Sequence, residues 1–427
     1  MRKFLALALV AVMMLALVAC GNDTTPAKTT DTSDSTASSD AAASTDATTD
    51  ATPVADDSFK IGFIFLHDEN STYDLNFINA AREAQAALGL SDDQVIFKTN
   101  IPESNECYEA ALDLVDRGCT VIFADSFGHE SYMLQAAREN PDVQFCHATG
   151  TMAHTEGLAN FHNAFASIYE GRYLAGIAAG LKLNEMIAAG QFKAEDAKIG
   201  YVGAFTYAEV ISGYTSFFLG ARSVCPTATM EVQFTGSWYD ETAEKEAATT
   251  LISRGCKLIS QHADSMGAPT ACETAGVPNV SYNGSTVAAC PNTFIVSSRI
   301  NWAPYFEYIV NCAKSGEAIA ADWTGTLATG SVELSEINAK AAAEGTQAAI
   351  DAAKAKLESG ELHVFDTAVF TVGGETITSY LADVDTDANY EKDTEVVADG
   401  YFHESEKRSA PYFDLDIDGI TKLNAAY

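Results

Sequence analysis

The residues best suited to ligand chemistry in this sequence stand directly after short apolar runs that are typical of buried strands. They carry carboxyl, hydroxyl or amide groups, and they are Asp125, Ser126, Asp264 and Asn283. Groups of this kind can hydrogen-bond a polar ligand and fix its orientation. Their placement at strand ends predicts a binding site.

Motifs for covalent or metal chemistry are missing from the same sequence. It has no Gly-x-Ser-x-Gly elbow, no phosphate loop, no His-x-His or His-Glu-x-x-His pair and no Cys-x-x-Cys pair. We therefore expect no catalytic residue, no metal site and no cofactor. Asp240, which precedes a helical pattern, is interpreted as a helix cap and not as a ligand contact.

The first positioning unit runs from Lys60 to Gly89. Residues 60–66 form an apolar run that predicts a buried strand, residues 67–76 are a polar loop, and residues 80–88 are good helix formers. In open α/β sheets the ligand lies beyond the carboxyl ends of the strands. The loop at residues 67–76 is therefore expected at the ligand edge.

Strand and helix patterns alternate from this unit onward, and the series restarts at residue 198. Lys198-Ile199-Gly200 echoes Lys60-Ile61-Gly62. Alternation of this kind predicts parallel sheets covered on both faces. We expect an α/β fold of two doubly wound parallel-sheet lobes that close about a hinge over an interlobe cleft.

The expected boundaries follow this repetition. Lobe 1 takes residues 58–163 with a return segment at about 302–330. Lobe 2 takes residues 164–301, and a C-terminal tail at about 331–427 braces one lobe.

Two further patterns bear on packing. Gly171, Gly176 and Gly180 lie within a long predicted helix over residues 165–183, which suggests tight contact with a neighbouring helix. In the tail we expect a helix over residues 339–358, followed by strands at 363–365 and 368–372 with a turn at Gly373-Gly374.

The N-terminal residues resemble a secretory signal. Arg2 and Lys3 precede the apolar stretch 4–19, and Leu-Val-Ala-Cys-Gly matches a lipobox with Cys20 as the lipidated residue. An ordinary cleaved signal with an incidental cysteine is the alternative. Residues 1–20 are thus assigned as a lipoprotein signal peptide, and residues 21–57, rich in Ser, Thr, Ala and Asp, as a disordered tether.

The net charge excludes some classes of binding partner, and the cysteine spacing bears on disulfide bonds. A formal net charge of −34 argues against nucleic acid and against direct adhesion to an anionic membrane, which leaves the lipid anchor as the expected membrane contact. The eight cysteines beyond Cys20 are interpreted mainly as small buried residues, with Cys107–Cys119 and Cys272–Cys290 left open as possible bridges.

Five ordered blocks resemble the basic membrane protein family, the purine-nucleoside-receptor-like binding lipoproteins of ABC importers. They are Ser126-Phe127-Gly128, residues 169–176, residues 237–240, residues 261–264 and residues 301–305. The resemblance covers roughly residues 59–370. It implies a type I periplasmic-binding-protein fold, a purine nucleoside or base as ligand, and ABC permease subunits as partners.

The resemblance also implies site residues. Tyr73 stands where nucleoside-binding members carry a stacking Phe, Asp74 stands where they often have Asn, and Tyr214 falls near the opposing aromatic residue. Further rings that can stack on a flat ligand are Phe205, Trp238 and Trp302. Relatives carry a late Lys that reaches the ribose, whereas the matching stretch here offers Asn301 and Trp302.

Because that Lys is missing, a free base or another flat solute stays open as the ligand. The leading hypothesis is an extracytoplasmic solute receptor, anchored by lipid at the cell membrane and not an enzyme. The main alternative is the same role for a flavin or a sugar. A secreted nucleoside hydrolase is the weakest alternative, because no catalytic motif supports it.

Overall fold

The structure is a computed structural model that describes residues 58–387 and 389–427. The predictions made for Cys20, for the signal peptide and for the tether concern residues outside this part of the chain. No helix within the described residues is long and apolar enough to cross a membrane.

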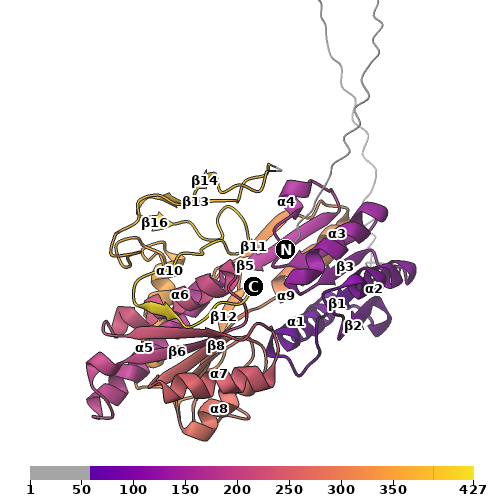
Figure 1. Cartoon of the computed structure of the whole chain (residues 1–427). Helices are drawn as coiled ribbons and strands as arrows, with labels where there is room; N and C mark the ends of the chain where they lie inside the picture. Colours follow the sequence, from indigo (N-terminus) through magenta and orange to yellow (C-terminus); the bar gives the residue numbers. More distant parts are fainter. Residues whose placement is uncertain (1–57, 388) are drawn as a thin grey trace, which may run out of the picture. The chain divides into compact units, whose positions relative to one another are not determined.

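The first lobe is built on a six-stranded sheet in the order β11-β5-β4-β3-β1-β2, in which all neighbouring strands are parallel (Figure 1). Its strands are β1 Ile61–Ile64, β2 Val95–Lys98, β3 Val121–Ala124, β4 Gln144–Ala148, β5 Phe161–Ala166 and β11 Asp322–Gly325. The helical segments in the same stretch and the return helix are α1 Thr72–Leu88, η1 Asp92–Gln94, α2 Asn105–Asp116, η2 Phe127–His129, α3 Glu130–Glu139, α4 Ala153–Glu156 and α9 Ala303–Ser315.

The second lobe is built on a seven-stranded sheet in the order β12-β10-β9-β8-β6-β7-β17. Only the β10–β12 pair is antiparallel among its described strand pairs. The strands are β6 Lys198–Gly203, β7 Thr229–Phe234, β8 Leu258–His262, β9 Asn279–Tyr282, β10 Phe294–Ile300, β12 Val332–Leu334 and β17 Ile420–Lys422. Its helical segments are α5 Ile168–Ala188, η3 Ala194–Asp196, α6 Ala208–Val224, α7 Glu241–Ser253, α8 Gly267–Ala275 and α10 Thr346–Glu358.

Both sheets therefore have the parallel, helix-covered architecture that the alternating pattern predicts. Strands β1 and β3 are buried along their whole length, as expected for strands covered on both faces. The α/β class with two parallel-sheet lobes is confirmed.

Helices α5 and α6 pack closely because glycines line their contact. A Cβ on Gly176 would lie 2.0 Å from the backbone oxygen of Phe217, and one on Gly220 would lie 2.0 Å from that of Tyr173. Gly180 is similarly constrained, since a Cβ there would lie 2.4 Å from the backbone oxygen of Ala221. The predicted tight helix contact is confirmed, and it makes α5 part of the second lobe.

Three chain crossings connect the lobes, after β5, after β10 and after β11. Ser167 N–H donates to Gly325 oxygen at 2.8 Å, and Asn301 N–H donates to Ser331 oxygen at 2.8 Å. The crossings thus lie side by side. Strand β5 continues to Ala166 in the first sheet, three residues beyond the boundary expected from the sequence.

The tail differs from its sequence-based description. Helix α10 begins at Thr346 instead of residue 339, and residues 363–372 form no strands, although Val372 and Glu375 make one isolated bridge at the predicted glycine turn. The tail's short strands are β13 Leu381–Ala382, β14 Thr394–Glu395, β15 Val397–Ala398 and β16 Tyr401–Phe402. Apolar runs of three to five residues do not distinguish a strand from buried irregular chain.

The eight cysteines within the described residues are free and buried. Their interpretation as small buried side chains is confirmed, and neither Cys107–Cys119 nor Cys272–Cys290 is bridged.

Candidate functional site

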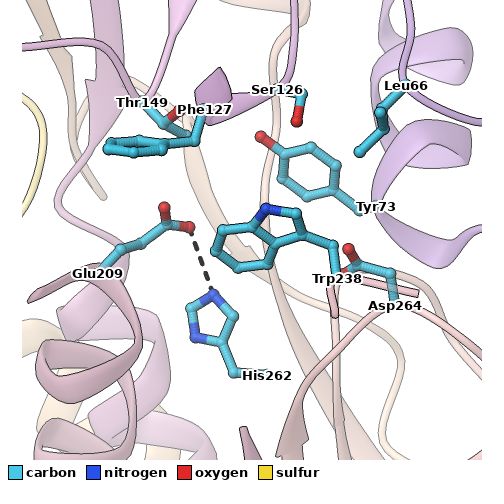
Figure 2. A pocket seen from close by; sticks show the side chains of 9 residues that line it. All are labelled: Leu66, Tyr73, Ser126, Phe127, Thr149, Glu209, Trp238, His262 and Asp264. Atoms are coloured by element: carbon cyan, nitrogen blue, oxygen red, sulfur yellow. Dashed lines mark hydrogen bonds and ion pairs between the residues drawn. The ribbon is translucent and has the colours of Figure 1, made fainter. Parts of the chain in front are cut away.

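A narrow cavity lies between the two lobes, at the carboxyl ends of their parallel strands, and the space not filled by atoms there is about 320 Å³ when its opening to solvent is included. We call it the cleft cavity, and Figure 2 shows the nine side chains that line it. Those from the first lobe are Leu66, Tyr73, Ser126, Phe127 and Thr149, and those from the second lobe are Glu209, Trp238, His262 and Asp264. Four of the nine, Tyr73, Ser126, Trp238 and Asp264, are residues that the sequence singled out.

The two lobes touch across this cavity. Thr72 donates from its backbone N–H to the backbone oxygen of Asp264 at 2.9 Å, and from its hydroxyl to the same oxygen at 3.2 Å. The rings of Phe127 and Tyr207 pair at 5.4 Å between centroids. These contacts hold the cleft in a closed arrangement.

Tyr73 is positioned by the start of α1. Ser71 caps this helix by accepting the N–H of Asp74, so the helix begins at Thr72 and takes in Tyr73 and Asp74, which the sequence placed in a loop. The Tyr73 hydroxyl donates to the backbone oxygen of Asp125 at 2.7 Å. This bond fixes the ring as part of the first-lobe wall.

Asp74 supports the same loop and does not line the cavity. Its carboxylate accepts the N–H of His67 at 2.7 Å and the hydroxyl of Ser71 at 2.6 Å. Burial alone would raise the pKa of Asp74, but these hydrogen bonds lower it below its usual value. Asp74 therefore stays charged and holds the turn between β1 and α1.

Asp125 also lies behind the wall. One carboxyl oxygen accepts the N–H of Leu66 at 3.1 Å, and the other is buried without a partner among the described residues. Burial and the nearby Asp74 carboxylate raise the pKa of Asp125 well above its usual range, which favours the neutral acid.

Asp264 brings a carboxyl group to the second-lobe wall, and the residue is only 4% accessible. Its backbone is fixed on both sides, by Thr72 across the cleft and by its own N–H donating to Trp238 oxygen at 2.9 Å. The carboxyl group itself has no hydrogen-bond partner among the described residues. Burial, followed by the carboxylates of Asp74, Glu244 and Glu209, raises the pKa of Asp264 well above its usual range.

Glu209 and His262 form a pair in the same wall, with 3.3 Å between Oε1 and Nε2 (Figure 2). Burial lowers the pKa of His262, although the contact with Glu209 opposes that shift. The neutral ring leaves Nδ1 buried and without a partner in the described chain. This Nδ1 atom faces α6, since a Cβ on Gly213 would lie 2.9 Å from it, so Asp264 is the residue of this wall that offers an unpaired polar group to the cavity.

Trp238 completes the second-lobe wall, and Phe205 supports it from behind. The rings of Phe205 and Trp238 meet edge to face at 5.1 Å, while Phe205 stacks on Tyr207 at 5.1 Å. Phe205 does not line the cavity. The ring of Trp238 provides apolar surface for a flat solute, as does that of Tyr73 on the other wall.

Thr149 is the strained residue of the first-lobe wall. Its φ is 65°, an uncommon value for a β-branched residue, and its hydroxyl is buried without a partner among the described residues. Gly150 follows it because a Cβ there would lie 2.0 Å from the amide nitrogen of Asn163. Strain of this kind is concentrated at ligand sites, where surrounding contacts hold the residue in place.

A buried glutamate supports each wall from the start of a helix. Glu130 of α3 accepts the N–H groups of Thr151 and Met152 at 2.8 Å each, and Glu244 of α7 accepts the N–H of Ser265 at 3.2 Å. Burial raises the pKa of both glutamates, that of Glu244 to about 7. These two carboxyls position the loops that carry Thr149 and Asp264.

Asp240 caps α7 by accepting the N–H of Ala243 at 2.9 Å, as predicted.

Two rings that the resemblance placed at the ligand lie in hydrophobic cores instead. Trp302 is 1% exposed and stacks on Phe77 at 4.6 Å between centroids, because α9 begins there and covers the first sheet. Tyr214 is buried within α6, with its ring 5.7 Å from that of Tyr201. Neither lines the cleft cavity.

Asn283 and Asn301 likewise lie away from the cavity lining. Asn283 adopts a φ of 64° in the turn after β9, and its N–H donates to Ser298 oxygen at 2.9 Å. Asn301 serves the chain crossing, where its side-chain oxygen accepts the N–H of Ala303 at 3.1 Å.

The lining residues that the sequence did not single out are Leu66, Phe127, Thr149, Glu209 and His262. Thr149 and His262 stand at the ends of β4 and β8, so the strand-end rule that selected Asp125 and Asp264 would also have found them. Glu209 has no such signal, because it lies in the first turn of α6.

A cluster of three aspartates lies in the C-terminal tail and does not line the cleft cavity. Carboxylate oxygens of Asp385, Asp387 and Asp393 lie within 4.8 Å of one another, and two of the three residues are exposed. Exposed acidic groups of this kind are common without a bound ion.

The fold and the cleft together define a two-lobed α/β solute-binding protein. The family described as PnrA-like ABC transporter substrate-binding protein, Bmp, matches residues 71–364, and the chain belongs to this family. Membership implies a small-molecule ligand and permease partners.

Individual relatives agree with this class. The chain is 29% identical over 320 residues to a purine-binding protein of Brucella abortus (strain 2308), covering 73% of this chain and 84% of that protein. It is 34% identical over 216 residues to a protein of Haloferax volcanii provisionally named an ABC transporter glucose-binding protein, covering 51% of each. An ABC transporter solute-binding protein of Conexibacter woesei shares the fold, with a TM-score of 0.58, 21% identity, and coverage of 71% of this chain and 98% of that one.

Proposed function

We propose that this protein captures a purine base or nucleoside in the cleft cavity and presents it to the permease of an ABC importer. The observation that carries the proposal is Asp264, a carboxyl that is buried in the cavity wall and accepts no hydrogen bond from the described chain. A hydrogen bond between a ligand and this carboxyl contributes about 0.5–1.5 kcal/mol.

The rings of the cavity suit a planar head group. Tyr73 comes from the first lobe and Trp238 from the second, and both line the cavity. Stacking of a base on one aromatic ring contributes about 1–3 kcal/mol. The Asp264 carboxyl then provides a polar group at the edge of such a base.

The purine assignment is supported by the purine-binding relative, which aligns with most of this chain. We further propose that the solute is bound and released unchanged, as suits a member of a substrate-binding family. In this proposal the protein acts on the extracytoplasmic face, held by a lipid on Cys20 and a tether over residues 21–57, as the sequence of the N-terminal region indicates.

Calorimetric titration of the purified chain, after unfolding and refolding to remove any carried ligand, tests the proposal. Adenine, hypoxanthine, adenosine, riboflavin and glucose are titrated in turn into the wild-type protein, Asp264→Asn and a matched surface control, Asp92→Asn. We expect a purine compound to bind most tightly, with affinity reduced at least about tenfold in Asp264→Asn and unchanged in Asp92→Asn. A protein that binds none of the purine compounds would contradict it.

A sugar is the second candidate ligand. It is favoured by the relative provisionally named as a glucose-binding protein, which aligns with half of this chain. Tight binding of glucose without purine binding in the same titration series would replace the purine proposal with this one.

A further inference from the structure

A contact between the lobes lies outside the cleft cavity, where the ring of His67 meets the ring of Tyr239. The centroids of the two rings are 5.2 Å apart, with an angle of 37° between the ring planes. His67 lies in the turn between β1 and α1 of the first lobe, and Tyr239 stands just before α7 of the second lobe. Neither residue lines the cleft cavity. This contact is thus made by the closed arrangement and broken when the lobes separate.

His67 also lies beside a buried negative charge of its own lobe. Its Nδ1 atom is 3.4 Å from a carboxylate oxygen of Asp74, a side chain with no exposed surface. This Nδ1 atom is buried and has no hydrogen-bond partner in the described chain. The hydrogen bonds that Asp74 accepts come from its own turn, through His67 N–H and the Ser71 hydroxyl, so they persist in either arrangement of the lobes. A proton on Nδ1 would therefore lie next to a negative charge.

The second lobe brings further acidic groups toward the same ring. Burial raises the pKa of Tyr239 above its usual value, and three nearby carboxylates add to the shift. Two of them, Glu241 and Glu244, belong to α7, and the third is Asp68, which follows His67 in the first lobe. Closure therefore places the His67 ring between acidic groups of both lobes.

The type of residue at position 67 matters for this arrangement. Histidine is the side chain that ordinarily gains or loses its charge between about pH 5 and 8. The side chain of His67 is 31% exposed, so it can exchange a proton with solvent. A cation on the face of an aromatic ring is attracted by that ring, and it is also attracted by the surrounding carboxylates. Protonation therefore strengthens a contact that the closed arrangement completes, and closure in turn favours the protonated ring.

We infer that His67 is a positioning residue whose protonated ring holds the first lobe against Tyr239 of the second, so that solute binding and proton uptake favour each other. His67 acts on closure and not on the solute, since it lies outside the cavity lining. The inference goes beyond the proposed function, because it applies to whichever solute closes the cleft.

Calorimetric titration of adenosine into the full chain at about pH 5.5 and at about pH 8 tests the inference. The measured quantity is the ratio of the two affinities, because the other titrating groups contribute to this ratio in every variant. The wild-type ratio is expected to exceed that of His67→Gln at least about threefold, since Gln takes up no proton. Tyr239→Ala, which removes the ring on the opposite lobe, is expected to lower the ratio by a similar factor. His154→Gln in α4 is the matched control and is expected to keep the wild-type ratio.

Equal ratios in the wild type and His67→Gln would overturn the inference. A lower ratio in His67→Gln that Tyr239→Ala does not share would also overturn it, because the effect would then not cross the cleft. Failure of adenosine, adenine and hypoxanthine to bind at either pH would contradict the proposed function alone.

Small-angle scattering of the solute-free chain then decides the role of His67 without any ligand. The wild type is expected to have a smaller radius of gyration at the lower pH than at the higher pH, by a margin that His67→Gln lacks. Equal changes in the radius of gyration of the two proteins would overturn the inference in that case.

Discussion

The two walls of the cleft cavity use their polar groups differently. On the first-lobe wall the Tyr73 hydroxyl donates to Asp125 oxygen at 2.7 Å, and the Ser126 hydroxyl donates to Glu103 at 2.6 Å. On the second-lobe wall the Asp264 carboxyl accepts no hydrogen bond from the described chain. Apart from the Thr149 hydroxyl, which is buried without a partner in the described chain, these groups of the first-lobe wall are already paired, whereas the Asp264 carboxyl of the second-lobe wall is available to discriminate between ligands.

The largest expected effect is a difference between two variants, Trp302→Ala, which lowers stability, and Trp238→Ala, which lowers ligand affinity. Trp302 lies in the core behind the first wall, so Trp302→Ala is expected to lower the free energy of unfolding by about 3–5 kcal/mol. Trp238→Ala removes ring surface from the second wall, and it is expected to weaken ligand binding at least about tenfold with a smaller loss of stability. Denaturant unfolding and calorimetry measure the two effects, and a reversed order would contradict the placement of both rings.

The buried glutamates that support the two walls predict that the free energy of unfolding depends on pH. Burial raises the pKa of Glu244 from 4.5 to about 7, so the folded chain keeps a proton that the unfolded chain releases. This contribution to stability is therefore complete below about pH 4.5 and is lost as the pH rises through 7, by up to about 3 kcal/mol. Glu244→Gln should flatten the dependence of unfolding free energy on pH over this range.

Other buried groups with raised pKa values, including Glu170 and Glu404, add to the slope in the wild-type protein. The informative quantity is thus the difference between the wild type and Glu244→Gln at each pH. Glu130→Gln is the matched variant on the first wall and should reduce the slope in the same direction, since burial raises the pKa of Glu130 as well. Parallel curves for the wild type and Glu244→Gln would show that Glu244 does not titrate differently on folding.

Polar substitutions on the two walls sharpen the comparison directly. Asp264→Ala is expected to reduce ligand affinity by about 1.5–3 kcal/mol, because the unpaired carboxyl is the group available to the solute. Ser126→Ala, which removes a hydroxyl already paired with Glu103, is expected to reduce affinity less than threefold. Calorimetry measures the ligand affinity of both variants, and equal losses of affinity would contradict the distinction between the walls.

The smallest effect is expected from Tyr73→Phe. It deletes the hydroxyl that donates to Asp125 and keeps the ring, so it should cost about 1 kcal/mol of stability and leave ligand affinity within threefold. Tyr73→Ala, which also removes the ring, should weaken binding by a further tenfold or so. A binding loss in Tyr73→Phe as large as in Tyr73→Ala would mean that the hydroxyl contacts the solute.

Much of the fold could be predicted because its signals are local. The echo of Lys60-Ile61-Gly62 in Lys198-Ile199-Gly200 marks the first strand of each lobe, β1 and β6, and Gly176 and Gly180 mark the α5–α6 contact. The tail could not be predicted as well. Its strands are two or three residues long and its chain is fixed by distant partners, as in the pairing of β17 with β7.

The candidate site divides in a similar way. Asp264 and Ser126 follow strands, and parallel strands bring such residues to one edge of a sheet. Trp302 and Tyr214 follow no such rule, because a ring near a strand end faces either the cleft or the core according to the direction of its helix. Glu209 was missed because charge in the first turn of a helix is common without any ligand.

The side-by-side chain crossings bear on how binding would change the populations of open and closed molecules. The crossings are held together by backbone hydrogen bonds at Ser167 and Asn301, so separating the lobes leaves both sheets whole. Separating the lobes breaks contacts at the cavity, such as the two hydrogen bonds from Thr72 to Asp264 oxygen, and it also strains the tail, which is bonded to the first lobe through Ser409 and to the second lobe through Ala426. A solute that touches both walls needs only about 5 kcal/mol of preference for the closed form to convert a mostly open ensemble into a mostly closed one.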